Sequence, residues 1–217
     1  MKQFLNAGIA AGLAAVVATG AAWAEEDVTK TFELSGFDMI DIAGVYDLNV
    51  KVGSDFSIVL TGSEREMNVA QVSVRDGVLI LDRRKRERNE NAIHRDGIEA
   101  VVTLPSLKGL EVSGVVAGEI TGIDADSFNL DLSGVGDLTI TGQCNDLDAK
   151  VSGVGDLTAE DLECNKVKVK VSGVGSASVY ARQAVEARVS GMGDIEVFGS
   201  PEDVHKNGSM FSDITIH

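Results

Sequence analysis

The chain is poor in the residue types from which catalytic and metal sites are most often built. Its 217 residues contain three histidines, two cysteines and one tryptophan, and aromatic residues make up 5% of the sequence. His94, His205 and His217 lie far apart, so they form neither a metal-ligand spacing nor a Ser/His/Asp arrangement. The sequence therefore predicts no catalytic residues, no cofactor and no bound metal, and its scattered aromatics are a poor basis for a sugar-stacking surface.

Positive charge is scarce as well. Nineteen Lys and Arg residues stand against 34 Asp and Glu residues, which gives a net charge of −15. This balance favours solubility and argues against a protein that binds nucleic acid. The exception is a basic cluster between two strand-like segments, formed by Arg83, Arg84, Lys85, Arg86 and Arg88. These side chains suit phosphate or carboxylate groups of an anionic ligand. The alternative, which we favour, is a solvated hairpin whose charges discourage edge pairing.

The N-terminal residues 1–24 have the composition of a secretory signal peptide. Lys2 is their only charge, an apolar run follows from Leu5 to Val17, and Ala22-Trp23-Ala24 precedes an acidic stretch. The alternative is a retained membrane anchor, for which the run is only weakly hydrophobic. No cysteine stands at the expected cleavage point. We therefore expect an exported protein in the periplasm or at the cell surface, with no retained transmembrane helix and a single domain over residues 25–217.

A glycine-rich unit, Val-Ser-Gly-Val-Gly-Asp-Leu, recurs through residues 109–217. Its serines are separated by 20, 19, 20 and 18 residues, at Ser113, Ser133, Ser152, Ser172 and Ser190. A unit this short cannot bury its own apolar side chains, so the copies must stack as a solenoid. Valines alternate with lysines in Val167–Val171, as expected of a half-buried strand. No six-residue subperiod is present, and we predict an all-β, right-handed parallel β-helix with about 19–20 residues per coil.

Residues 25–108 read as less regular strands without the glycine repeat. Apolar residues alternate in several short segments, at 37–42, 45–52, 57–61, 69–74, 78–81 and 98–104. Asp76-Gly77 predicts a hairpin turn, and Ser63 predicts the cap of one helical turn that ends near Met67.

The two cysteines occupy one position in neighbouring coils. Cys144 and Cys164 each lie eight residues before a repeat serine, and parallel strands about 4.8 Å apart bring such residues within reach of a disulfide. We predict that bridge, because an exported protein meets oxidising conditions. The alternative is a pair of small buried hydrophobic residues.

Three further polar columns invite a functional interpretation. Asp137, Asp156 and Asp194 follow the corner glycines and could bind calcium, but we favour caps in which each Asp bonds a backbone N–H of its own turn. The repeat serines are interpreted as hydroxyls that bond along the stack. A basic stripe on one sheet has acidic residues interleaved, and we favour charge pairing on a solvated face over a ligand-binding role. The stripe contains Lys150, Lys168, Lys170 and Arg188.

The Gly-Val-Gly-Asp-Leu units, with the Leu-Pro-Ser-Leu segment inside Val101–Gly114, give the sequence a resemblance to a known family. It resembles the bacterial family called the putative autotransporter adhesin head domain, or GIN domain. The resemblance covers Phe37 to the C-terminus and implies a β-solenoid without established catalytic residues, to which adhesion is assigned by architecture. Ser176 stands where the family usually has an acid.

The sequence and this resemblance together predict an exported, non-enzymatic β-solenoid that serves as an adhesion or cell-envelope binding module. Its expected partners are an envelope glycan, lipopolysaccharide or another envelope protein. Two alternatives stay open: a β-helix enzyme that processes polysaccharide, and a structural periplasmic partner protein.

Overall fold

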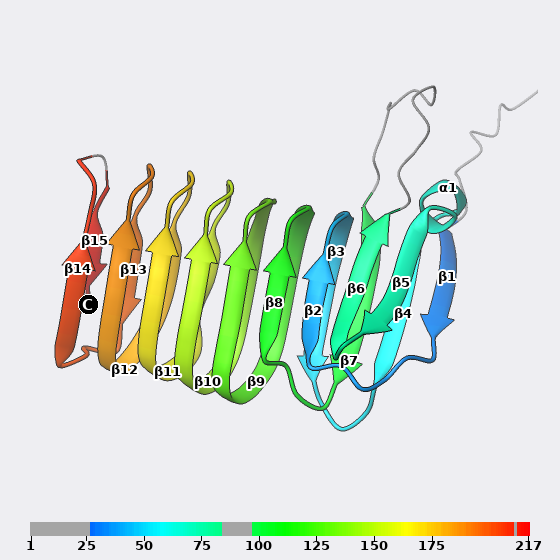
Figure 1. Ribbon diagram of the computed structural model, residues 1–217, viewed down its shortest axis with the longest axis horizontal. Coiled ribbons are helices and arrows are strands. Elements are labelled where there is room, and N and C mark those ends of the chain that lie inside the picture. Colours follow the sequence, from blue (N-terminus) through cyan, green and yellow to red (C-terminus); the bar gives the residue numbers. More distant parts are fainter. Residues whose placement is uncertain (1–26, 84–96, 211) are drawn as a thin grey trace, which may run out of the picture.

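The chain winds as a flattened β-solenoid of about five turns, whose two long sheets lie back to back (Figure 1). The computed structural model describes residues 27–83, 97–210 and 212–217, so the predicted signal peptide at 1–24 lies outside the described residues. The chain rises along the sheet nearer the viewer in Figure 1, called the front sheet below. It then turns a sharp corner, descends along the back sheet and returns through a broad bend. This path confirms the predicted right-handed parallel β-helix.

The described residues form fifteen strands and one helical turn. In chain order they are β1 (Asp27–Phe32), β2 (Met39–Ile42), β3 (Val45–Val52), β4 (Ser57–Ser63), α1 (Glu64–Met67), β5 (Ala70–Arg75), β6 (Val78–Arg83), β7 (Ile98–Leu104), β8 (Gly109–Val112), β9 (Val115–Leu132), β10 (Val135–Val151), β11 (Leu157–Val171), β12 (Ala177–Val189), β13 (Ile195–Phe198), β14 (Asp203–Asn207) and β15 (Ile214–Ile216). Each of β9 to β12 bends midway, so its first half lies in the back sheet and its second half in the front sheet.

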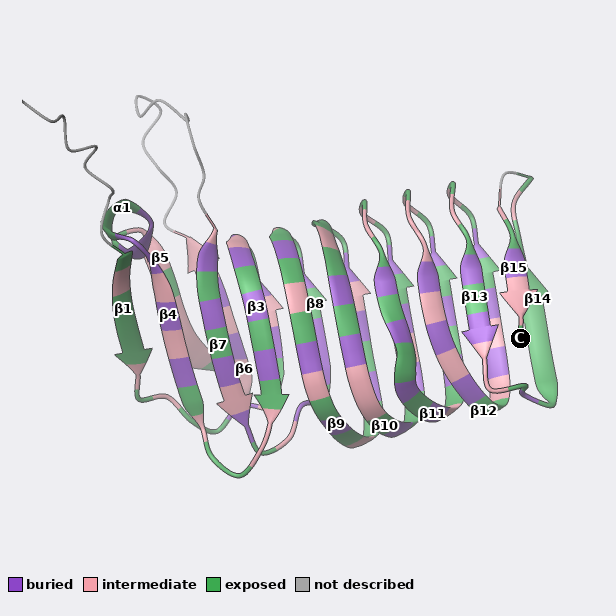
Figure 2. Ribbon diagram, turned by 180° about the vertical axis from the view of Figure 1, so that it is seen from behind, coloured by how far each residue is buried: buried purple, intermediate pink, exposed green. Residues whose placement is uncertain are grey.

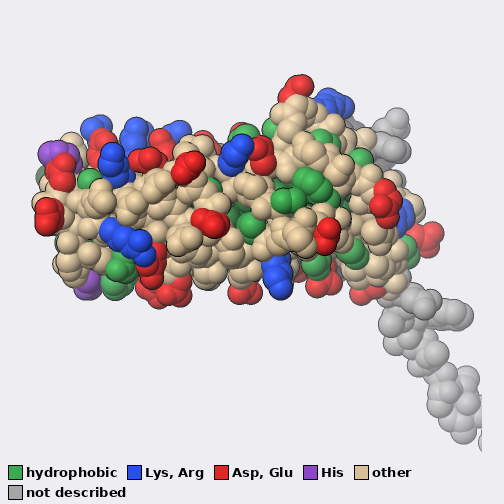
Figure 3. Space-filling view, turned by 90° about the horizontal axis from the view of Figure 1, so that it is seen from below, with side chains coloured by type: hydrophobic (Ala, Val, Ile, Leu, Met, Phe, Trp, Pro, Cys, Tyr) green, Lys and Arg blue, Asp and Glu red, His purple; other side chains and the backbone are tan. Residues whose placement is uncertain are grey.

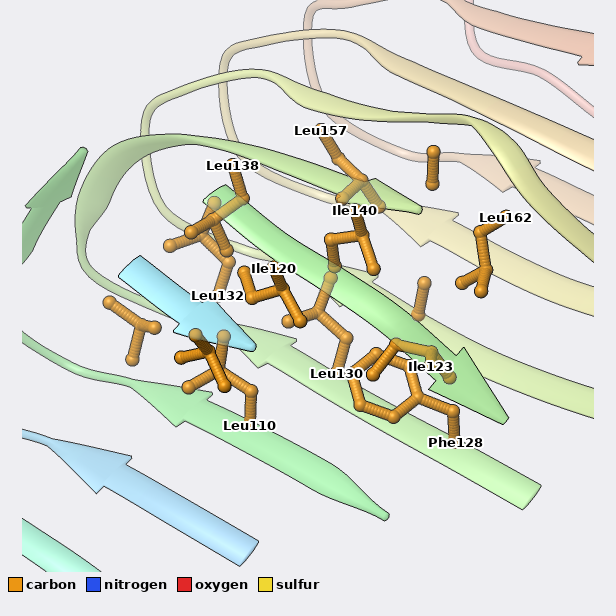
Figure 4. Packing of buried hydrophobic residues seen from close by; sticks show 14 of the residues in the cluster. Leu110, Ile120, Ile123, Phe128, Leu130, Leu132, Leu138, Ile140, Leu157 and Leu162 are labelled. Atoms are coloured by element: carbon orange, nitrogen blue, oxygen red, sulfur yellow. The ribbon is translucent and has the colours of Figure 1, made fainter. Parts of the chain in front are cut away.

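The core is a set of apolar columns between the two sheets. Successive strand residues point to opposite faces, which gives the alternating buried and exposed bands of Figure 2. Val151, Val171 and Val189 are register partners in three successive coils, and none is more than 3% exposed. In Figure 4, Leu132 and Ile120 extend into the same interior from opposite sheets. Burial of each such side chain contributes about 1.5–3 kcal/mol, which no single coil could obtain alone.

The sharp corners depend on glycine because successive backbones approach closely there. A Cβ added to Gly153 would overlap the carbonyl oxygen of Gly134 in the preceding coil, and a Cβ on Gly173 would overlap that of Gly153. Gly155 and Gly175 carry a second constraint, since their φ angles are 147° and 152°. The predicted close approach therefore holds at each of these corners, and positive φ is added at some of them.

The N-terminal strands also form coils, but these coils do not stack in chain order. Strand β2 pairs in parallel with β6 on one side and β8 on the other. Strand β3 likewise lies between β7 and β9. The first coil of the chain, residues 39–52, is therefore enclosed between two coils that follow it in sequence.

Antiparallel strands close the N-terminal end of the stack. Strand β1 pairs with β4, β4 with β7 and β5 with β6, all antiparallel. The turn between β5 and β6 has positive φ at both Asp76 and Gly77, which confirms the predicted hairpin. The predicted helical turn is confirmed as well, because the N–H of Glu66 donates to Ser63 Oγ at 3.4 Å.

Candidate ligand-binding face

The front sheet presents a regular grid of outward side chains near the C-terminal end. The register between β9, β10, β11, β12 and β14 places them in three rows. The lower row is Ser127, Asp146, Lys166, Ala184 and Asp203; the middle row is Asn129, Asp148, Lys168, Glu186 and His205; the upper row is Asp131, Lys150, Lys170, Arg188 and Asn207. Neighbours within a row are about 4.8 Å apart, and adjacent rows are about 6.6 Å apart along each strand. This grid includes the whole basic stripe that the sequence singled out.

The upper row contains three consecutive cations beside one carboxylate, Asp131, which is the register partner of Lys150. Arg188 pairs with Glu186 of the middle row at 2.6 Å. Within the described part of the chain, Lys150 and Lys170 form no ion pair and no side-chain hydrogen bond. Like charges directly opposite each other destabilise a pair of strands. Lys170 has a cation on each side, Lys150 and Arg188, so charge pairing along the row does not account for it.

The middle row combines one cation with two carboxylates. Lys168 lies between Asp148 and Glu186 in register, and its Nζ is 3.8 Å from Asp148 Oδ2. The other carboxylate oxygen, Asp148 Oδ1, is buried without a hydrogen-bond partner among the described residues. Buried acceptors are rarely left in this condition, so the protein alone does not complete the hydrogen bonding of this row.

Two shallow hollows follow the grid. The upper hollow, of about 300 Å³, is bordered by Lys150, Lys170 and Arg188 together with the middle row. The lower hollow, of about 330 Å³, has the strand backbone at Leu147 and Val167 as its floor, since these two side chains are buried in the core, and its aliphatic surface comes from Ala184 and the methylene stems of Lys166 and Lys168. Asp148, Lys168 and Glu186 border both hollows, so the two are continuous. The lower hollow opens at Ala184, because its short side chain stands in the row between Lys166 and Asp203.

The two faces of the solenoid differ in charge. Seen from below, Lys and Arg side chains gather along the front-sheet edge near the C-terminal end, at the upper left of Figure 3, whereas acidic side chains dominate the opposite edge. On the back sheet, the outward positions include Glu119, Asp137 and Glu196. The grid carries five Lys or Arg side chains and five Asp or Glu side chains, so it is balanced in charge on an acidic molecule, and its cations are concentrated in the upper row.

The basic cluster predicted from sequence is described only in part. Arg83 is the last residue of β6, and its guanidinium donates to Glu66, whose side chain is 2% exposed. Arg83 itself is 16% exposed, so this residue serves a buried ion pair. Arg84, Lys85, Arg86 and Arg88 lie outside the described residues.

A disulfide joins Cys144 and Cys164 at the broad bend. The two residues are register partners in β10 and β11, with Cα atoms 4.5 Å apart. Beside them, Asn165 donates to Asn145 at 2.8 Å, and Asn145 donates to Asp126 at 2.9 Å. This amide ladder, which sequence reasoning missed, connects three successive coils at the bend.

The aspartate column caps the stack in a different way from the one predicted. Each Asp bonds the following coil rather than its own turn: Asp137 Oδ1 accepts from the N–H of Asp156 at 3.1 Å, and Asp156 Oδ1 accepts from that of Ser176 at 2.8 Å. The reason is the coil spacing, which places the next N–H within reach. In the described residues, no group of three or more His, Cys, Asp or Glu side chains is arranged to hold a metal ion.

Two of the five repeat serines bond along the stack as predicted, whereas the hydroxyls of Ser152, Ser172 and Ser190 form no hydrogen bond among the described residues. Ser133 Oγ donates to the carbonyl of Val112 at 3.2 Å, and Ser113 Oγ donates to that of Ile42 at 3.3 Å. After the first corner glycine of each repeat, however, the apolar residue points outward, which the strand alternation did not predict. These residues form an apolar ridge in which each residue is 45–59% exposed. The ridge consists of Val115, Val135, Val154, Val174 and Met192.

The chain matches a known protein family over most of its length. The family model described as "Putative auto-transporter adhesin, head GIN domain" matches residues 36–201. The chain belongs to this family. The match to the GIN domain spans both the out-of-order N-terminal coils and the glycine repeats, and it confirms the resemblance found in the sequence.

Solved structures share the fold of this GIN domain. A putative adhesin from Bacteroides fragilis is 23% identical, with a TM-score of 0.74, and the match covers 89% of this chain and 98% of that chain. A putative adhesin from Parabacteroides distasonis is 19% identical, with a TM-score of 0.55, and the match covers 88% and 97%. At these identities the likeness shows the fold alone. No curated protein matches the chain.

Proposed function

We propose that this GIN domain is an exported, non-enzymatic adhesion module that contacts cell-envelope components through the grid on its front sheet. The family description and the printed names of the structural relatives support an adhesin at this level. The observation that carries the proposal is the upper row, where Lys170 stands between Lys150 and Arg188 and neither lysine forms an ion pair among the described residues, on a chain of net charge −15.

A solenoid face suits adhesion because its side chains are held at fixed spacings. The grid residues lie on strands whose alternate side chains are buried, so a ligand does not have to order the backbone. Cations in successive coils can contact one anionic group of a ligand together, and several such domains on one surface add weak contacts to a useful affinity. Electrostatic attraction of this kind is strongest at low salt.

The arrangement of carboxylates supports binding rather than glycan cleavage. A glycoside hydrolase uses two carboxyl groups that face each other across the scissile bond. In the grid, Asp148 and Glu186 each contact a cation, Lys168 and Arg188 respectively. Among the described residues, no helix has the length and apolar character needed to cross a membrane.

The test is sedimentation of the purified protein with bacterial envelope vesicles over a series of salt concentrations. The upper-row variant combines Lys150→Ser, Lys170→Ser and Arg188→Ser. Its control combines Lys51→Ser, Arg65→Ser and Arg75→Ser, which removes three exposed, unpaired cations outside the grid and changes the net charge equally. We expect the upper-row variant to lose about tenfold in retention and the control to bind normally. Equal retention of both variants would overturn the proposal.

A further inference from the structure

The three upper-row cations form one continuous row on the outer face of the sheet, next to Asp131. Lys150, Lys170 and Arg188 are register partners on neighbouring strands, so they span about 10 Å. One of these cations is enough to balance the single negative charge of a carboxylate. A phosphate monoester carries a charge of about −1.5 to −2 and three acceptor oxygens, and can therefore engage all three.

The two carboxylates of the middle row favour a ligand whose negative charge is confined to one group. Asp148 and Glu186 lie directly below the cations and would repel a polymer that carries charge at every unit. The same two carboxylates are suitable acceptors for hydroxyl groups. Asp148 Oδ1 lacks a partner, and rotation of the carboxylate would exchange it with the oxygen that faces Lys168. The row is thus matched to a group rich in hydroxyls that is attached to the phosphate.

The lower hollow continues from these carboxylates and is partly aliphatic. Its aliphatic surface is formed by Ala184, which also leaves it open to solvent, and by the methylene stems of Lys166 and Lys168; the side chains of Leu147, Val167 and Val185 are buried in the core beneath it. The volumes of the two hollows, about 300 and 330 Å³, are each within the size of small-ligand sites. Apolar walls beside hydroxyl acceptors suit the C–H faces of a sugar ring.

From this sequence of cations, carboxylates and aliphatic walls we infer that the grid is a binding site for a sugar phosphate. The phosphate lies against Lys150, Lys170 and Arg188, ring hydroxyls donate to Asp148 and Glu186, and the ring extends toward Ala184. This inference rests on the proposed function, because it names the ligand of the same face. The phosphorylated sugar can be part of a glycan or the headgroup of a lipid.

The first experiment measures binding of the purified protein to hexose 6-phosphate on beads, with hexose beads, uronic-acid beads and inorganic-phosphate competition as comparisons. We expect retention on the hexose 6-phosphate beads alone, reduced about tenfold or more by the upper-row variant and unchanged in the control variant. Equal retention on uronic-acid beads would overturn the assignment to phosphate. Vesicles with phosphatidylinositol 4-phosphate present the same chemistry on a lipid, and the stronger of the two responses identifies the source.

The second experiment separates the sugar from the phosphate. The variant Asp148→Asn with Glu186→Gln should weaken binding of hexose 6-phosphate by about fivefold and leave inorganic phosphate binding equal or tighter, since two negative charges are removed. If the binding of hexose 6-phosphate and the binding of inorganic phosphate weaken by the same factor, the sugar assignment is overturned. Thermal unfolding by circular dichroism checks that each variant is folded. If envelope retention depends on the upper row but no sugar phosphate binds, the inference fails and the proposed function stands; if envelope retention is also independent of that row, both fail.

Discussion

Lys206 occupies in the last coil the register position that the fully buried Ala187 occupies in the coil before it. The apolar column of the front sheet therefore ends at a charged residue. The ammonium group of Lys206 reaches across the end of the stack and donates to the carbonyl of Ile214 at 3.2 Å. Inward-pointing charges on terminal strands prevent edge-to-edge association, because a partner strand would have to bury them.

Replacement of Lys206 by valine should make the protein self-associate. The variant extends the apolar column to the open edge of β14, a strand that is exposed throughout, and removes the charge that disfavours pairing. Sedimentation velocity at increasing protein concentration measures the effect. The control is Lys51→Val, at an outward position of β3. A Lys206→Val protein that stays at the mass of the wild type across the series would show that this lysine does not protect the edge.

Gly153→Ala should destabilise the solenoid strongly. The added Cβ would overlap the carbonyl oxygen of Gly134, and backbone on both sides cannot move without separating the coils. We expect a loss of about 3 kcal/mol in the free energy of unfolding, at the upper end of overpacking effects. Gly62→Ala is the matched control, because its Cβ would lie 3.5 Å from Ile98 Cγ1, an ordinary contact. Urea denaturation measures the free energy of unfolding of both variants. Equal values would contradict the close approach of the two backbones as the reason for glycine at this corner.

The fold of the repeat region could be predicted from sequence because the patterns that specify it lie within single coils. The spacing of Ser133, Ser152 and Ser172 sets the coil length, and the alternation within Val167–Val171 sets which side chains are buried. The position of the first coil could not be predicted in this way. Strand β2 reads like any other half-buried strand, and nothing within it specifies that its neighbours, β6 and β8, are 36 or more residues away along the chain.

From the sequence alone, the candidate site could be recognised only as a stripe of basic residues. Alternation placed Lys168 and Lys170 on one outward face, but pairing depends on the register with β10 and β12, which carry Asp148 and Glu186. The hollow at Ala184 is a property of side-chain size across three strands. The aspartate caps were misassigned for a related reason: sequence shows the turn that an Asp belongs to, whereas Asp156 bonds the N–H of the coil stacked upon it.

Loss of the disulfide should destabilise the broad bend without preventing folding. Cys144 and Cys164 close a loop with a sequence separation of 20 residues, and a cross-link of this length contributes about 3 kcal/mol. The double variant Cys144→Ser and Cys164→Ser should unfold at a correspondingly lower urea concentration. Wild-type protein treated with reductant should match it. A double variant as stable as the oxidised wild type would mean that the flanking amide ladder of Asn145 and Asn165 suffices.

The solenoid should lose stability at high pH through Tyr46. Its side chain is 1% exposed and its hydroxyl donates to the carbonyl of Asp82 at 3.3 Å. Burial raises the pKa of Tyr46 from 10.0 to about 12; Arg83 opposes this shift, and the carboxylates of Asp82 and Glu66 add to it. Below pH 10 the phenol is protonated in both the folded and the unfolded chain, so its ionisation does not affect stability. Between pH 10 and 12 the unfolded chain releases the proton and the folded chain retains it, so the free energy of unfolding should fall by about 3 kcal/mol.

Two variants test this expectation. Tyr46→Phe should unfold with a smaller alkaline loss of stability than the wild type, although it lacks the hydrogen bond to Asp82. In Tyr180→Phe, Tyr46 is the only tyrosine left, so the ultraviolet absorbance of tyrosinate reports on it alone. The folded variant should titrate near pH 12 and the urea-unfolded variant near pH 10. A midpoint near 10 in the folded protein would mean that water reaches the ring, which is incompatible with the packing of the first coil between its two neighbours.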